Sequence, residues 1–194
     1  MALTEIAFQY FRFSDTAAYL SATREGLVWP AGGVQKMGAW VTAVGELNRG
    51  VVLYQKETAA EPQTANRALL AALPGIEEKR HLLQPVRNFT PPKQSMKIHE
   101  LRLYNLYPGK VEEFLSLLLA ILPLRERYSP NAGIWRALEG DTTRVFHLWT
   151  YQSYEERDRS RMAINVEPDW RDYVGKITPL IAKMRSSFLQ TVAY

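Results

Sequence analysis

The chain of 194 residues lacks cysteine. This absence excludes disulfide bonds, thiol nucleophiles and zinc sites built on thiolates. It is compatible with a reducing compartment, and we expect a cytoplasmic protein. The chain also lacks a phosphate-binding glycine loop and a dinucleotide-binding glycine motif, so we expect it to use no cofactor.

Long hydrophobic runs are absent too. The most apolar segment, from Phe114 to Leu124, is shorter than the roughly 20 apolar residues that a membrane-spanning helix needs. Near the N-terminus the basic residue Arg12 follows the apolar residues, whereas a secretory signal places its basic residues first. We therefore expect no membrane partner and no secretion signal.

A strong charge of one sign is also missing. The formal net charge is +4, and 24 basic residues are interleaved with 20 acidic ones. The most densely charged stretch, 155–161, contains both signs. A nucleic-acid-binding protein usually gathers its basic residues on one face. We therefore expect no nucleic-acid partner and interpret this stretch as the solvated face of a helix.

What the chain does contain is an internal repeat. When the sequence is shifted by 95 positions, identical residues coincide in one register from the first expected strand to the third. The identical pairs are Glu5 and Glu100, Gly38 and Gly133, Trp40 and Trp135, Gly45 and Gly140, Arg49 and Arg144, and Leu53 and Leu148. Unrelated segments rarely share tryptophans and glycines in this way, so we predict a duplicated unit.

The proline-rich stretch 90–95 separates the two copies, because prolines are poorly accommodated inside helices and sheets. We predict a first domain over 1–90 and a second over 97–194. In the second domain the patterns predict strands at 98–106, 133–139, 143–151 and 188–194, and helices at 110–127, from Ser153 to about Ile164, and from Pro168 along an apolar stripe that includes Ile181 and Met184. Pro179 is expected to bend or shorten that last helix.

This order of strand, helix, strand, strand, helix, strand is that of the ferredoxin-like split βαβ unit. The first copy fits the same order, with a shorter second helix over 64–73 and a less regular segment over 77–89. One sheet face of such a unit carries no helix, and two units can cover these faces by pairing them. We therefore predict the α+β class, with two tandem ferredoxin-like (βαββαβ) units forming an α+β barrel.

A set of residues in the second copy has a characteristic order and spacing. It comprises Ile98-His99-Glu100-Leu101-Arg102-Leu103-Tyr104, Pro108-Gly109-Lys110, Phe114, the run from Val145 to Tyr151, Ser153, Arg157, Pro168, Trp170, Tyr173, Lys176, Pro179 and Met184. With these residues, 97–194 resembles the NIPSNAP family. The resemblance implies the dimeric α+β barrel superfamily, which also contains small oxygenases, isomerases and haem-binding enzymes. It implies a fold more than an activity, since NIPSNAP proteins have no well-defined reaction.

Strand alternation sorts the side chains of the second copy by sheet face. We assign Leu101, Leu103, Ile134, Phe146 and Leu148 to the face that meets the helices. The residues alternating with them are expected to line the barrel interior as a ligand pocket: Glu100, Arg102, Tyr104, Trp135, His147 and Trp149. Aromatic walls with a few converging polar groups are typical of a small-molecule pocket.

The first copy offers an internal comparison. Its equivalent positions are Glu5, Ala7, Gln9, Trp40, Val52 and Tyr54. It therefore lacks counterparts of Arg102, Tyr104 and His147, and we interpret these three as functional candidates and the shared residues as architectural.

Histidine chemistry is restricted to one position. His147 could act as a general base, since imidazole exchanges protons near neutral pH, or it could be a core histidine. A single inward histidine cannot form a metal site made of protein ligands, so no metal is expected. His81 and His99 are expected at the surface or at a sheet edge.

Three functions remain open at this stage. The first is the binding of a small, partly apolar or aromatic molecule in the barrel. The second is a cofactor-independent oxygenase or isomerase acting on an organic substrate, with His147 as base and Arg102 holding an anion. The third is a protein-interaction module without a ligand. The copies can pair within one chain or across the two-fold axis of a homodimer.

Overall fold

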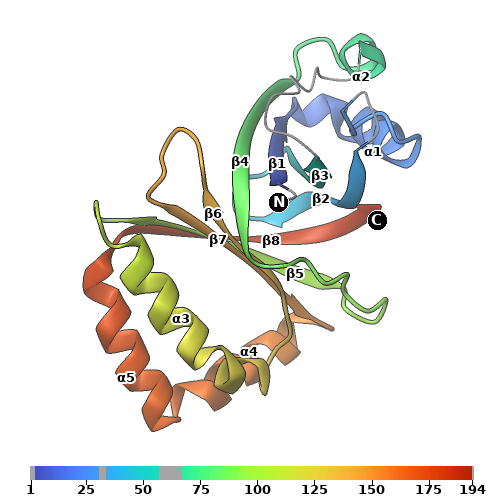
Figure 1. The fold of residues 1–194 in the computed structure, drawn as a ribbon. Coiled ribbons are helices and arrows are strands. Elements are labelled where there is room, and N and C mark those ends of the chain that lie inside the picture. Colours follow the sequence, from blue (N-terminus) through green and yellow to red (C-terminus); the bar gives the residue numbers. More distant parts are fainter. Residues whose placement is uncertain (1–2, 31–33, 57–66, 194) are drawn as a thin grey trace. The chain divides into compact units, whose positions relative to one another are not determined.

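A computed structural model describes residues 3–30, 34–56 and 67–193 of the chain (Figure 1). The chain divides into two compact units. Unit 1 comprises 1–85, 138–140 and 187–194, and unit 2 comprises 86–137 and 141–186. The last strand of the chain contributes to both units, which a boundary near 90–95 alone does not anticipate.

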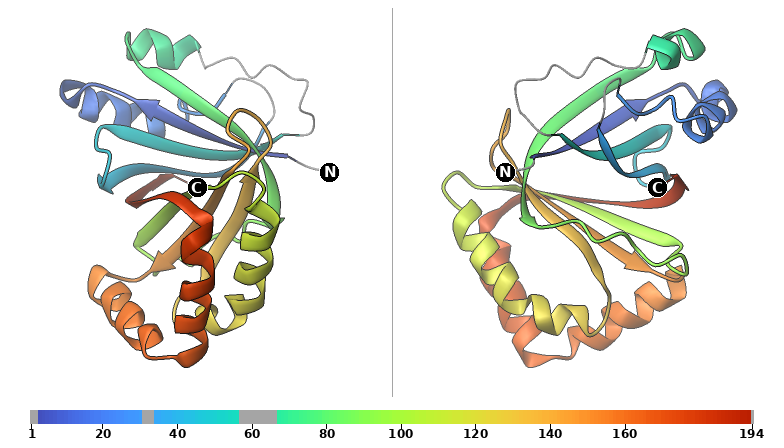
Figure 2. Two further views of the ribbon diagram at one scale, coloured as in Figure 1. Left: turned by 90° about the vertical axis from the view of Figure 1, so that its left-hand side faces the viewer. Right: turned by 45° about the vertical axis from the view of Figure 1, so that its right-hand side comes forward.

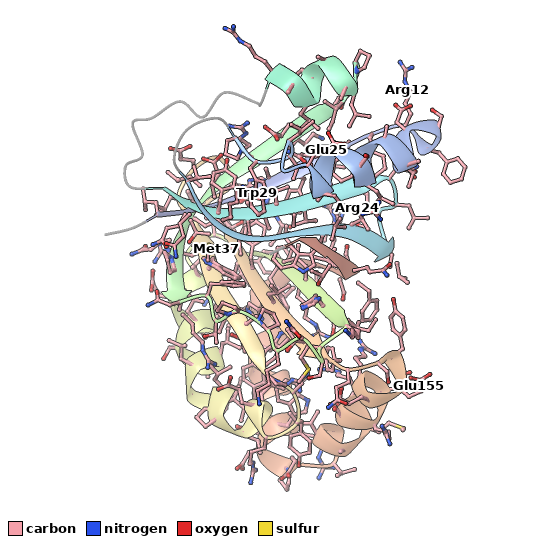
Figure 3. The ribbon with its side chains drawn as sticks, turned by 90° about the vertical axis from the view of Figure 1, so that its right-hand side faces the viewer. Arg12, Arg24, Glu25, Trp29, Met37 and Glu155 are labelled. Carbon is pink, nitrogen blue, oxygen red and sulfur yellow. The ribbon has the colours of Figure 1, made fainter. Side chains whose placement is uncertain are left out.

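The described part of unit 1 contains an antiparallel sheet and two α-helices. Its elements are β1 (Leu3–Tyr10), the 3₁₀ turn η1 (Phe13–Asp15), α1 (Thr16–Arg24), β2 (Gln35–Val44), β3 (Arg49–Lys56), α2 (Arg67–Ala72) and β4 (Glu77–Arg87). The strand order is β4–β1–β3–β2, and the C-terminal part of β8 (Ile181–Ala193) pairs with β2. Tyr19 of α1, Leu69 of α2 and Trp29 share one apolar core. Figure 3 labels Trp29.

Unit 2 contains a second antiparallel sheet and three helices. Its elements are β5 (Ile98–Leu106), α3 (Val111–Glu126), β6 (Asn131–Ala137), β7 (Arg144–Tyr151), α4 (Tyr154–Asn165), α5 (Pro168–Ile177), the 3₁₀ turn η2 (Thr178–Leu180) and the first part of β8. The strand order is β8–β5–β7–β6. Figures 1 and 2 show α3 and α5 side by side along one face of this sheet, with α4 leading into α5.

The predicted class, a mixture of α-helices and β-strands, is confirmed in both units. The strand at 98–106 has the predicted bounds, and the helix predicted over 110–127 is α3. In the first copy, the helix predicted over 64–73 corresponds to α2, although 64–66 lie outside the described residues. The segment 77–89, whose pattern is less regular, forms β4. The closure of the two units into one barrel stays a prediction.

The helix that begins at Pro168 ends earlier than its apolar stripe suggests. α5 stops at Ile177, and η2 leads directly into β8. Ile181 and Met184 are therefore strand residues, and their assignment to the helix is wrong. Pro179 explains the difference, because it has no N–H for a helical hydrogen bond and its ring clashes with the preceding turn.

The predicted capping box at the start of α4 is confirmed. The Ser153 hydroxyl accepts a hydrogen bond from the Glu156 backbone N–H at 3.2 Å. The Glu156 carboxylate reaches back and accepts from the Gln152 backbone N–H. The first bond satisfies a donor that the first turn of the helix leaves free, and the second binds the residue before the cap to the helix. Glu155 lies exposed on the outer side of α4 (Figure 3).

The glycine–tryptophan pairs of the repeat make the same contact in both units. A Cβ atom added to Gly133 would lie 2.3 Å from the Trp135 ring, and one added to Gly38 would lie 2.3 Å from the Trp40 ring. Each indole therefore lies flat against the glycine two positions earlier on the same sheet face, where any larger residue would collide. This shared contact explains why both residues occur in both copies, and it supports the predicted duplication.

Candidate functional site

Unit 2 contains a cavity of about 380 Å³ between its sheet and its helices. Most of its wall is aromatic or aliphatic, and its polar atoms come mainly from basic side chains. The sheet contributes Arg102, Tyr104, His147 and Trp149, and the helices contribute Arg125, Arg161, Trp170, Tyr173, Val174 and Ile177. None of the described residues that line it is acidic.

The cavity lies on the sheet face that meets the helices, whereas we predicted a pocket on the opposite face. Tyr104 packs against Phe114 of α3, with their ring centres 5.1 Å apart, and Trp149 lies 4.6 Å from the guanidinium carbon of Arg125 in α3. His147 shares this face, with its ring centre 4.9 Å from that of Tyr104. The predicted orientation of these side chains toward a barrel interior is therefore wrong, although the strand pattern groups them correctly.

The six predicted pocket residues consequently separate into three groups. Arg102, Tyr104, His147 and Trp149 line the cavity. Glu100 lies on the same sheet face, because residues two apart in a strand share a face. It does not line the cavity but binds Arg102, which does. Trp135 lies on the opposite face from Ile134, which packs in the helix-side core as expected, so Trp135 does not belong to this site.

Glu100 is fully buried and holds several donors in place. One carboxylate oxygen accepts from Arg102 Nε and from the Ser186 hydroxyl, both at 2.8 Å, and the other accepts from the Tyr151 hydroxyl at 3.2 Å. Arg157 of α4 reaches the two oxygens at 3.4 and 3.5 Å. Burial alone would raise the pKa of Glu100, but Arg102, Ser186 and Arg157 outweigh burial and lower it from 4.5 to about 2. Glu100 is therefore ionised at neutral pH and positions Arg102 and α4.

Arg125 lies in α3 with only 2% of its surface exposed. Its Nη2 donates to the Tyr151 hydroxyl at 2.9 Å, and its guanidinium carbon lies 4.6 Å from the Trp149 ring and 5.8 Å from the Trp170 ring. Its buried Nη1 has no hydrogen-bond partner among the described residues. Burial, followed by the repulsion of Arg102, lowers the pKa of Arg125 from its ordinary value.

Arg161 reaches the same cavity from α4. Its guanidinium carbon lies 5.7 Å from the Trp170 ring, and its buried Nη1 also lacks a hydrogen-bond partner in the part of the chain that the structure describes. Burial, then the charges of Arg102 and Arg125, lower the pKa of Arg161. The site thus contains more buried positive charge than the sequence led us to expect.

His147 is buried against the Tyr104 and Phe114 rings, whose centres lie 4.9 and 5.9 Å from its own. Burial, and then the nearby Arg102 charge, lower the pKa of His147 from 6.5 to about 3. Its Nε2 has no hydrogen-bond partner among the described residues. The imidazole is therefore neutral at physiological pH, and it is a much weaker base than general-base catalysis near neutrality requires.

His99 does not lie at the surface or at an edge, as the sequence suggested. It is fully buried, and burial lowers its pKa from 6.5 to about 4. Alternation along β5 does not predict the burial of His99, because both faces of this strand are buried.

These two histidines predict a specific loss of stability in acid. Below about pH 6.5 the unfolded chain protonates both imidazoles, whereas the folded chain protonates His99 only near pH 4 and His147 only near pH 3. The free energy of unfolding is therefore expected to fall by about 1.4 kcal/mol per pH unit for each histidine as the pH drops below about 6. Denaturant titrations between about pH 7 and pH 4.5 measure this slope.

The matched variants are His147→Gln and His99→Gln. Each is expected to remove about half of the contribution that these two histidines make to the slope, and the double variant should remove both shares. A His147→Gln protein whose stability keeps the wild-type pH dependence would contradict the neutral, buried state of this imidazole.

No group of three His, Asp or Glu side chains among the described residues is placed to hold a metal ion. No helix within 3–30, 34–56 or 67–193 combines the length and apolar character that a membrane span requires.

The sequence of the second half decides the family. A family model described as NIPSNAP matches residues 99–194. These residues belong to the NIPSNAP family. All of the cavity residues named above lie within this NIPSNAP domain, so the pocket is a feature of the domain and not of the first copy.

Relatives match different shares of the chain. It is 28% identical over 166 residues to the NipSnap homolog of Dictyostelium discoideum, covering 79% of this chain and 74% of that protein. It is 35% identical over 85 residues to NipSnap homolog 3B of Mus musculus, covering 43% of this chain and 34% of that protein. The chain thus spans about three quarters of the first relative but only about a third of the second.

A solved structure resembles the NIPSNAP domain and the first copy together. It is described as an anthrone oxidase-like protein and aligns over 98% of this chain and 91% of its own, with a TM-score of 0.75 and 11% identity. At this level of identity the likeness shows the fold alone. It supports the mixed α and β fold over the length of the chain and carries no information on chemistry.

Proposed function

We propose that the NIPSNAP domain binds a small, partly apolar or aromatic molecule in the cavity of unit 2. The observation that carries this proposal is an unfilled volume of about 380 Å³ between the sheet and the helices of unit 2. Well-packed protein interiors contain few voids larger than a water molecule, whereas ligand pockets measure roughly 300–1,000 Å³. The space is therefore of the size that a small ligand fills.

The wall chemistry supports the same proposal. Trp149, Trp170 and Tyr173 offer aromatic surfaces for an apolar ligand body. Arg102 is fixed by Glu100, and its Nη1 donates to the Tyr104 hydroxyl at 3.3 Å. A few oriented polar groups in an apolar wall are what gives a pocket its selectivity.

A variant that blocks the cavity provides the test. Val174 of α5 lines the cavity and is 39% exposed, so its side chain stands at the rim. We expect a wild-type melting temperature that rises with 2-naphthamide or 2-naphthoate, two probes with a bicyclic aromatic body. Val174→Trp should fill the rim and abolish this rise.

Met162→Trp is the matched control. Met162 of α4 is 66% exposed and does not line the cavity, so this variant should respond to the probes as the wild type does. Equal probe responses of Val174→Trp and the wild type would place binding elsewhere, and the absence of any response at millimolar probe would refute the proposal.

The two other functions are less well supported. A cofactor-independent oxygenase or isomerase needs a proton acceptor, and the pKa of His147, lowered to about 3 by burial and by Arg102, weakens this candidate. A protein-interaction module needs no internal space, whereas the described part of unit 2 contains a cavity. Binding, with or without turnover, therefore agrees best with the arrangement.

A further inference from the structure

The charge balance around the cavity is uneven. The buried carboxylate of Glu100 forms its ion pairs with Arg102 and Arg157. Neither Arg125 nor Arg161 forms an ion pair in the described part of the chain, and none of the described lining residues is acidic. Two guanidinium groups therefore face the cavity, and neither has an ion-pair partner in direct contact among the described residues.

The donors of these groups are unused as well. Arg125 Nη1 and Arg161 Nη1 are buried and have no hydrogen-bond partner among the described residues, and the same holds for His147 Nε2. A buried charged donor without a partner costs several kcal/mol in other proteins. An occupant with acceptor atoms would satisfy the two charged donors and, with them, the neutral imidazole nitrogen of His147.

A second buried arginine shows how this chain treats a structural guanidinium. Arg49 in unit 1 is 7% exposed, and each of its three nitrogens has a partner. Nε donates to Thr42 at 3.2 Å, Nη1 to Glu46 at 2.7 Å and Nη2 to Ser187 at 2.9 Å. The contrast with Arg125 argues that the open donors of Arg125 do not serve packing.

Aromatic rings hold the two open guanidinium groups in place. Arg125 of α3 lies over the Trp149 and Trp170 rings. Arg161 of α4 also lies over the Trp170 ring. Stacking restrains a guanidinium without occupying the N–H groups at its edge, which remain free for planar acceptors such as carboxylate or phosphate. The donors are thus oriented before any ligand arrives.

We infer that the molecule bound in this cavity is an organic anion, with a carboxylate or phosphate held by Arg125 and Arg161 and an apolar body against the aromatic wall. This inference rests on the proposed function and names its ligand class. Neutral His147 contributes a hydrogen bond through Nε2. Because two guanidinium groups have no ion-pair partner in direct contact, a head group with one or two negative charges suits the site.

Isosteric probes test the charge of the ligand. 2-Naphthoate and 2-naphthamide share a ring system and differ in charge, so calorimetric titration of the full chain with both isolates the anionic group. We expect 2-naphthoate to bind the wild type at least about tenfold more tightly than 2-naphthamide. Arg125→Met and Arg161→Met should each weaken 2-naphthoate about tenfold or more and change 2-naphthamide by less than about threefold.

Arg127→Met is the matched control, because it removes the same charge from the end of α3 at a side chain that is 66% exposed. It should keep the wild-type preference. 1-Naphthyl phosphate separates the two head groups, since tighter binding than 2-naphthoate assigns phosphate and weaker binding assigns carboxylate. Equal wild-type affinities for 2-naphthoate and 2-naphthamide, or a preference unchanged in Arg125→Met, would overturn the inference and leave the proposed pocket standing.

Failure of the proposed function gives a different result. If neither naphthyl compound binds, inorganic phosphate alone still reports on the two arginines. Compared with sodium chloride at equal ionic strength, phosphate should raise the melting temperature of the wild type and have a smaller effect on Arg125→Met. Equal phosphate effects on both proteins would overturn the anion site independently of the aromatic pocket.

Discussion

Replacing Glu100 by glutamine is expected to lower the free energy of unfolding by about 3–5 kcal/mol. Glu100 is fully buried and accepts from Arg102, Arg157, Ser186 and Tyr151. The glutamine keeps the size of the side chain but leaves two arginines without their shared negative charge. It also turns an amide NH₂ toward a ring of donors. Breaking a buried pair from one side is costly because the remaining charge stays desolvated.

The lowered pKa of Glu100 gives an independent measure of the same effect. Its folded-state pKa is about 2, against an ordinary value of 4.5. For a lowered carboxyl pKa, the stabilisation is complete above the unfolded value and is lost as the pH falls toward the folded one. At about 1.4 kcal/mol per pH unit, this difference corresponds to roughly 3 kcal/mol, which agrees with the expected cost of substitution.

Denaturant unfolding of the variant at neutral pH measures the effect. Glu112→Gln is the control, because Glu112 also pairs with an arginine but its side chain is 76% exposed. It should change the free energy of unfolding by less than about 0.5 kcal/mol. A Glu100→Gln protein as stable as Glu112→Gln would show that the Glu100 network is not a structural element of unit 2.

Sequence patterns predicted the elements of unit 2 well because they reflect local physics. The bounds of β5 follow from alternation, the start of α4 from the Ser153 capping box, and the start of α5 from Pro168 at its first position. Each of these signals depends on residues within one or two turns of the chain. The end of α5 was predicted too late, because the apolar stripe continues past Pro179 whereas the helical backbone ends at Ile177.

The orientation of the sheet faces could not be predicted from alternation alone. Leu148 is 2% exposed and Trp149 is 3% exposed, so both faces of β7 are buried and neither is polar. Strand register would have resolved the ambiguity. Ile134 of β6 pairs with His147 of β7, and directly opposed residues share a face. Placing Ile134 against the helices therefore also requires His147 to face them.

Part of the site lies in helices, for which the sequence predicted only packing residues. Arg125 follows Leu118 by seven positions and Leu122 by three, and so it continues the apolar stripe of α3 onto a buried position. An arginine within such a stripe is a detectable signal, because charged side chains are rarely fully buried. Strand alternation grouped Arg102, Tyr104 and His147, and the comparison of the two copies singled them out. Neither signal extends to residues in the helices.

Replacing Arg125 by methionine is expected to leave the free energy of unfolding unchanged or to raise it by up to about 3 kcal/mol. The wild-type guanidinium is buried, lacks an ion pair in the described part of the chain, and has an unpartnered Nη1. Methionine has a similar length and packs well against aromatic rings such as Trp149 and Trp170. The hydroxyl of Tyr151 loses one donor but still donates to Glu100 at 3.2 Å.

Arg49→Met provides the opposite expectation in the same chain. Arg49 is similarly buried, but all three of its nitrogens have partners, so its removal should lower the free energy of unfolding by roughly 1–3 kcal/mol. Denaturant titration of both variants, compared at equal m-values, measures the difference. A loss of more than about 1 kcal/mol in Arg125→Met would assign this arginine to structure. Opposite signs for two buried arginines would indicate that the chain keeps one charge for stability and the other, at a cost in stability, for a ligand.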